Sequence, residues 1–183
     1  MDIITENRYE LAEYNLTMIK KFKDKIRNGE LKIQYCRKLT NLEFQQELEI
    51  HKLILIGCQN IVPTLKSCTL KELVIQDSNL QNIDGLELEN LEILDVQGNE
   101  ELCNSNFKKF KKLTQLYASG TIIDISLLVQ LQQLRILNLS NTKLQELSPL
   151  QFLVNLEELY LSSNYGIITN YHQYIYKSML IIV

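Results

Sequence analysis

Leucine recurs at a nearly constant interval along most of the chain. The stretch LRILNLSNT, which begins at Leu134, returns as LEELYLSSN from Leu156. Both fit the pattern L-x-x-L-x-L-x-x-N, and further matches begin at Asn28, Ile50, Leu70, Leu91 and Leu113. Position 4 of this unit is leucine in all seven copies, and the intervals between successive copies are 22, 20, 21, 22, 21 and 22 residues. A register held over six steps predicts a repeat array.

The spacing within each unit predicts a short strand. Side chains alternate between the two faces of a strand, so the apolar positions 4 and 6 point into the coil while positions 3, 5 and 7 point out. One coil cannot bury its own apolar face, and stacking of neighbouring coils is therefore required. Stacked strands lie roughly 4.8 Å apart and form a parallel sheet.

These units resemble the leucine-rich repeat family, whose signature is L-x-x-L-x-L-x-x-N/C-x-L. The match covers residues 28–164. Phrases such as LQELSPLQFLVNLEELYLSSN are similar to those of bacterial internalins and of the leucine-rich regulatory subunits of type-1 protein phosphatase. The resemblance implies an α/β solenoid with a curved parallel sheet on its concave face and short helical or irregular segments on its convex face.

Position 9 is the turn that leaves each strand, and small polar residues or cysteine fill it. Buried backbone groups at such a turn need partners, which these side chains supply over short range. This gives Cys36 and Cys58 a structural role, and a metal pair or redox pair is the alternative. No C-x-x-C pair exists, so we expect reduced thiols, most of them buried. Cys68 and Cys103 lie outside this column, and the sequence assigns them no role.

The two ends of the chain differ from the repeats, which we assign to residues 30–166. Residues 1–29 are expected to form an N-terminal capping helix, because apolar residues from Leu11 to Ile26 follow helical spacing. Asn28-Gly29 would then stop that helix. A basic amphipathic helix that docks on a membrane or a partner is the rival interpretation, and interspersed acidic residues favour the cap.

Residues 167–183 are expected to form an irregular C-terminal tail, because the repeat pattern fails there. An exposed apolar end coil would be sticky. Two interpretations stay open at this point: the chain belongs to a longer array whose cap is truncated, or it self-associates through this end.

Composition narrows the function classes. The net charge of −3 gives no reason to expect nucleic acid as a partner. The first residues, MDIITENRYE, lack a basic segment followed by an apolar run, and no apolar stretch reaches the roughly 18 residues that span a bilayer. We therefore expect a cytoplasmic protein that does not bind membranes.

The sequence contains no recognisable catalytic or cofactor motif. Its two histidines, His51 and His172, stand outside any H-E-x-x-H pattern, and no glycine-rich phosphate loop or G-x-S-x-G serine appears. We expect no enzyme activity, no cofactor and no metal.

A protein partner is expected on the concave face, where the outward positions carry apolar and aromatic side chains. Among them Ile54, Val74, Ile93 and Ile136 should face solvent, and Tyr117 and Tyr160 stand two coils apart in one column. Aromatic anchors among apolar neighbours are typical of binding surfaces, although isoleucine and valine also suit strands by propensity. The predicted partner-binding residues are Ile54, Val74, Ile93, Asp95, Tyr117, Ile136, Asn138, Glu158 and Tyr160.

The predicted function is therefore a non-catalytic scaffold for protein–protein interaction. The alternative is a regulatory subunit of a phosphatase or of another signalling enzyme, as the resemblance would imply. An extracellular adhesion module is less favoured, because it requires export.

The inward leucines should carry stability rather than binding. We expect Leu137→Ala to lower the free energy of unfolding by roughly 2–5 kcal/mol, because it hollows a packed coil. Urea denaturation followed by circular dichroism measures this loss, and a near-neutral result would contradict the predicted inward direction of position 4.

Overall fold

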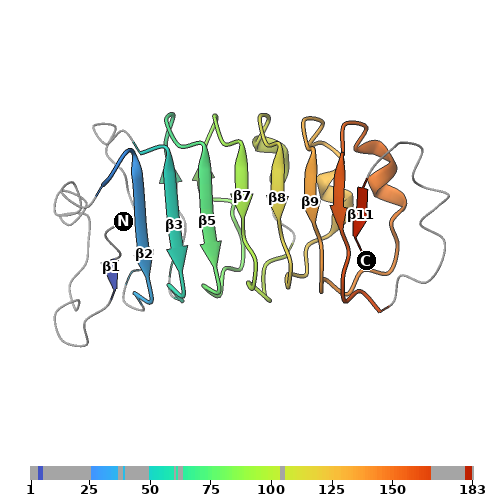
Figure 1. Cartoon of the computed structure of the whole chain (residues 1–183), viewed down its shortest axis with the longest axis horizontal. Helices are drawn as coiled ribbons and strands as arrows, with labels where there is room; N and C mark the ends of the chain where they lie inside the picture. Colours follow the sequence, from blue (N-terminus) through green and yellow to red (C-terminus); the bar gives the residue numbers. More distant parts are fainter. Residues whose placement is uncertain are drawn as a thin grey trace.

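The structure is a computed structural model that describes residues 4–5, 26–36, 39, 50–59, 61, 64–103, 106–165 and 180–182. Parallel strands stand side by side along the long axis of the molecule (Figure 1). The main sheet has nine strands in the order β1-β2-β3-β5-β7-β8-β9-β10-β11. Its strands are β1 (Ile4–Thr5), β2 (Glu30–Gln34), β3 (Lys52–Ile56), β5 (Glu72–Gln76), β7 (Ile93–Asp95), β8 (Gln115–Tyr117), β9 (Ile136–Asn138), β10 (Glu158–Tyr160) and β11 (Leu180–Ile182).

The strands pair in the register that the repeat predicts. Leu31 lies beside Leu53, and Leu53 lies beside Leu73. The same pairing continues to Leu159, so the position 4 leucines form one continuous row. All seven of them are 0–1% exposed. The predicted parallel-strand solenoid is therefore confirmed.

The return segments, which run behind the sheet, differ from the expected α/β composition. The described residues contain no α-helix, and the returns use 3-10 helices or a second, two-stranded sheet instead. These elements are β4 (Leu65–Lys66), β6 (Leu86–Glu87), η3 (Phe107–Lys109), η4 (Ile125–Leu128) and η5 (Ser148–Phe152). Such short returns suit units of 20–22 residues, which leave too few positions for full α-helical turns. None of the described helices is long and apolar enough to cross a membrane.

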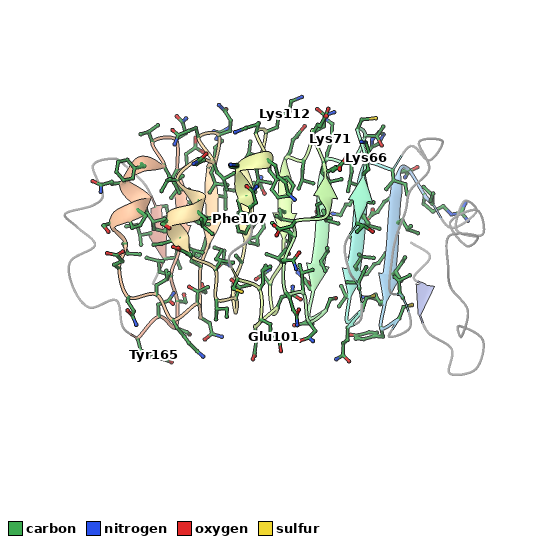
Figure 2. The ribbon with its side chains drawn as sticks, turned by 180° about the vertical axis from the view of Figure 1, so that it is seen from behind. Lys66, Lys71, Glu101, Phe107, Lys112 and Tyr165 are labelled. Atoms are coloured by element: carbon green, nitrogen blue, oxygen red, sulfur yellow. The ribbon has the colours of Figure 1, made fainter. Side chains whose placement is uncertain are left out.

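The core lies between the sheet and the returns. Leucine dominates it, and Phe107 and Phe110 replace leucine in one return with exposures of 0% and 1%. Phe107 lies on a return behind the sheet (Figure 2), and its side chain is fully buried. The core is thus continuous from coil to coil, as a stacked array requires.

The predicted capping helix is not shown, because residues 6–25 lie outside the described part of the chain. Residues 27–30 form a tight turn in place of the expected helix stop. Arg27 and Glu30 exchange two backbone hydrogen bonds of 3.1 and 2.9 Å, and Asn28 and Gly29 have φ values of 52° and 71°. Positive φ at both central residues is what a type I′ turn requires, and Asn-Gly is its preferred pair. Upstream, β1 pairs with the end of β2.

The C-terminal segment was expected to be irregular, but its last described residues form β11. This strand pairs in parallel with β10, and Ile181 lies beside Leu159 and packs against the core. The array therefore continues for one more strand than the leucine pattern predicts.

Buried side chains at position 9 satisfy the backbone where the chain leaves each strand. Asn99, which is fully buried, accepts hydrogen bonds of 3.0 Å from the backbone N–H groups of Ser78 and Leu80. Its amide group donates to the carbonyls of Ile75 at 2.7 Å and Val96 at 2.8 Å. One side chain therefore ties two adjacent coils together.

Threonine and cysteine at the same position make fewer bonds. Thr121 donates to the Ala118 carbonyl at 2.7 Å, within its own coil. The Sγ atoms of Cys36 and Cys58 lie 3.5 and 3.7 Å from carbonyl oxygens two residues earlier in the chain. Both cysteines are buried and neither forms a disulfide, which supports the structural role predicted for them.

Asn99→Ala should cost much more stability than Thr121→Ala. The asparagine variant leaves two N–H groups and two carbonyls without their partner in the core, so we expect a loss of about 3 kcal/mol or more in the free energy of unfolding. The threonine variant removes a single hydrogen bond and should cost about 1 kcal/mol. Urea denaturation of both variants provides the comparison, and equal losses would contradict the role of Asn99 as a tie between coils.

Candidate binding face

The side chains at positions 3, 5 and 7 of the repeat strands form one surface, here called the sheet face. The strand register aligns them in columns that cross the molecule. The position 5 column reads Lys32, Ile54, Val74, Asp95, Tyr117, Asn138, Tyr160 and Ile182. The position 3 column reads Glu30, Lys52, Glu72, Ile93, Gln115, Ile136, Glu158 and Leu180. All nine predicted partner-binding residues fall in these two columns.

The aliphatic residues of the sheet face are only partly open to solvent. Ile54, Ile93 and Ile136 are half-buried. Val74 is 9% exposed, so the expectation that it faces solvent freely is wrong. It lies between Ile54 and Asp95 in register, and little of it is left for a partner to contact.

Tyr117 lies near the middle of the sheet face, and its hydroxyl donates to Oε1 of Gln115 at 3.0 Å. Partial burial raises the pKa of this phenol, and the negative charges of Glu158, Asp95 and Glu72 raise it further. The phenol therefore stays neutral well into alkaline solution. Its ring stands in a negative electrostatic environment.

Tyr160 occupies the same column two strands away, and its hydroxyl donates to Oε2 of Glu158 at 2.8 Å. This hydrogen bond raises the pKa of the Tyr160 phenol, and desolvation and the charge of Glu158 add to the shift. Each tyrosine hydroxyl is thus bonded to a residue on its own strand. The bond restricts the rotation of each ring and holds it ready for contact.

Asp95 and Asn138 have local structural partners. Asp95 accepts hydrogen bonds from the side chains of Gln76 at 2.6 Å and Gln97 at 3.1 Å, and from the Gln97 backbone N–H at 3.1 Å. Asn138 accepts from the Ser140 backbone N–H at 3.0 Å. These bonds hold both side chains in fixed positions.

Charges are divided unevenly over the sheet face. Lys32 and Lys52 lie on β2 and β3, and Lys52 makes a 2.8 Å ion pair with Glu72 on β5. From β5 to β10 the outward positions carry three carboxylates, those of Glu72, Asp95 and Glu158, and no lysine or arginine.

Other charged side chains form pairs along the edge where the chain enters the strands. Lys66, Lys71 and Lys112 gather at that edge, and Glu101 and Tyr165 lie at the opposite one (Figure 2). Lys71 is 3.1 Å from Glu92, and Arg135 is 2.6 Å from Glu157. Exposed pairs of this kind contribute roughly 0–1 kcal/mol each.

Lys109 serves the fold of the returns. Its ammonium group donates to the carbonyls of Ile83 at 2.6 Å and Asp84 at 2.8 Å and lies 5.3 Å from the ring centre of Phe110. Desolvation by burial lowers its pKa.

The described residues offer no ready metal site. They include no cluster of three or more histidine, cysteine or acidic side chains able to hold a metal. His51 is exposed, with Nδ1 3.3 Å from the Thr69 carbonyl oxygen, and His172 lies outside the described residues. Cys68 is exposed and Cys103 is partly buried, so only two of the four cysteines are buried.

Sequence reasoning missed several residues that shape this face. Gln76, Gln97 and Gln115 support Asp95 and Tyr117, but a glutamine in an outward column gives no signal of its partner. Leu180 and Ile182 extend the face past β10, with exposures of 57% and 38%. The sequence did contain a signal for the strand that carries them, because Ile181 follows Leu159 by 22 residues, one full repeat interval.

Comparison with known proteins gives one family match. The family model described as leucine rich repeats (2 copies) matches residues 132–170, which include β9, η5 and β10. No curated protein matches the chain.

Neutralising Glu158 should lower the pKa of Tyr160. In Glu158→Gln the phenolate no longer faces a carboxylate, so the pKa should return toward its ordinary value of 10.0. The pKa of Tyr117 should fall by less, because burial is the larger cause of its shift. NMR titration of ring-labelled tyrosines measures both.

The stability of the folded protein should depend on the same Tyr160 phenol. Because its pKa is higher in the folded state than in the unfolded state, the phenol makes a contribution to folding stability that is present below a pH of about 10. That contribution is lost as pH rises through the folded-state pKa. Glu158→Gln should reduce that contribution, because desolvation of the Tyr160 phenol remains. The matched control is Glu157→Gln, which removes a neighbouring carboxylate paired with Arg135 and should leave the Tyr160 pKa where it was.

Proposed function

Because the chain is a leucine-rich repeat protein, we propose that it is a scaffold that binds a protein partner on the sheet face. Leucine-rich repeat domains generally mediate protein–protein interaction. A parallel array with a continuous core provides a rigid surface, and rigidity lowers the entropic cost of binding.

The observation that carries this proposal is the pair of tyrosines in the position 5 column. Tyr117 and Tyr160 are separated by two strand steps, roughly 10 Å. Both rings are half-buried, and their hydroxyls are tied by hydrogen bonds. Tyrosines that are already ordered lose little conformational entropy on binding, and tyrosine is enriched among residues that dominate binding energy.

The flanking isoleucines extend the apolar area around the tyrosines. Ile136 lies on β9, between the two tyrosine-bearing strands, and Ile93 lies beside Gln115 on the next strand. Both are partly exposed. A partner that covered this area would contact aromatic and aliphatic surface at the centre and polar side chains at the rim, as protein interfaces do.

Replacing both tyrosines should abolish most partner capture without unfolding the protein. Each ring points out from the sheet, so Tyr117→Ala with Tyr160→Ala should leave the thermal midpoint nearly unchanged. Affinity capture from cell extract followed by quantitative mass spectrometry compares the proteins retained by the wild type and by the variant. We expect the proteins that the wild type enriches to fall at least tenfold, the size of one hot-spot residue.

The matched control removes two exposed apolar side chains from the returns. Leu127 on η4 and Phe152 on η5 are 36% and 57% exposed. Leu127→Ala with Phe152→Ala should retain the captured proteins. Capture that survives loss of the tyrosines but fails in this control would place the partner on the returns and overturn the proposal. The identity of the retained proteins also separates a general scaffold from a subunit that regulates a phosphatase or another signalling enzyme.

A further inference from the structure

The sheet face from β5 to β10, here called the acidic face, carries charge of one sign. Glu72, Asp95 and Glu158 are its ionisable carboxylates, and its described outward positions include no lysine or arginine. Glu72 is neutralised by Lys52 at 2.8 Å. Within the described residues, Asp95 and Glu158 form no ion pair and bond only to neutral groups.

This arrangement contrasts with the edge where the chain enters the strands. Carboxylates of consecutive coils meet a cation there, as in the Lys71–Glu92 and Arg135–Glu157 pairs. The repeat places opposite charges side by side at this edge. On the acidic face it places two carboxylates on either side of Tyr117, and their charges add to the effect of burial in raising the pKa of that phenol.

The chemistry around Tyr117 suits a cation. A lysine ammonium or arginine guanidinium is attracted to the face of a tyrosine ring and pairs with a carboxylate beside it. Asp95 lies one strand from Tyr117, and Glu158 shares a strand and a hydrogen bond with Tyr160. Each tyrosine therefore has a carboxylate near its ring. An acidic segment or a phosphate backbone would instead meet like charge and find no basic side chain on this face.

We propose that the partner occupies the acidic face with a basic protein segment, which places one lysine or arginine near Asp95 and Tyr117 and a second near Glu158 and Tyr160. This inference rests on the proposed function and specifies the partner's chemistry. Asp95 and Glu158 are three strand steps apart across the sheet and two residues apart along it, together roughly 16 Å. An extended segment that crosses the strands covers that distance in about five residues, so its two basic residues would be about five positions apart.

Selection from a random displayed-peptide library on the immobilised protein tests the proposal. We expect the selected peptides to carry two basic residues about five positions apart, with apolar residues between them. A synthetic copy of the most enriched peptide is then measured by fluorescence polarisation. Its binding should weaken about tenfold in Asp95→Asn with Glu158→Gln, and it should also weaken as salt concentration rises.

The matched control changes the net charge equally but away from the acidic face. Glu89 and Glu146 are exposed residues outside the repeat strands, and Glu89→Gln with Glu146→Gln should leave peptide binding unchanged. Equal weakening in both double variants would show a general charge effect and overturn the proposal.

The remaining outcomes also decide between the two proposals. Neutral or acidic peptides that bind the wild type but not the tyrosine double variant would overturn the basic segment and leave the sheet face as the binding surface. Basic peptides that bind the tyrosine variant and the carboxylate variant as well as they bind the wild type would overturn both proposals. The proposal also fails if the library gives no basic binder, or if the chain covers the acidic face with a second copy of itself, detected as a dimer that Asp95→Asn with Glu158→Gln dissociates.

Discussion

In-register parallel pairing of the repeat strands is the constraint on which the rest of the molecule depends. Each strand presents alternate residues to opposite faces, so a shift of one residue would exchange the core set for the solvent set. Leu137 and Leu139 are 0% exposed, and Asn138 between them faces outward. Burial of the leucines therefore fixes the outward columns as firmly as it fixes the core, although the outward residues contribute little to the register themselves.

The turn after each strand maintains that register from coil to coil. The residue before position 9 has a positive φ in all seven repeats, at Tyr35, Gly57, Asp77, Gly98, Gly120, Asn141 and Ser163. The chain then turns inward, and its buried polar groups need partners. Asn99 and Asn164 provide them to two coils at once, whereas Thr121 serves only its own coil. Small polar residues and cysteine therefore share this position, because each offers a short side chain that reaches nearby backbone.

The sequence predicted most of the repeat region because a period constrains many residues together. The row from Leu31 to Leu159 and both tyrosines follow from counting alone. The structure differs from the sequence prediction where one local interaction decides the conformation. Asn28-Gly29 fits both a helix stop and a type I′ turn, and the two hydrogen bonds between Arg27 and Glu30 close the turn. Ile181 repeats the interval from Leu159, but it stands in the continuous apolar run MLIIV, where no alternation marks one residue as inward. Val74 faces outward by register, yet only its neighbours in three dimensions determine that it is covered.

The character of the sheet face is informative because folding does not require it. Positions 4, 6 and 9 are restricted by burial and by hydrogen bonding, whereas any side chain that suits a strand satisfies positions 3 and 5. At one end of this face two such positions neutralise each other, as Lys52 and Glu72 do at 2.8 Å. Around Tyr117 and Tyr160 they instead combine two aromatic rings with two carboxylates that lack a cation in the described structure. Stability alone would favour a lysine beside Asp95 or Glu158. A partner that supplies the missing cation gives this arrangement a physical reason.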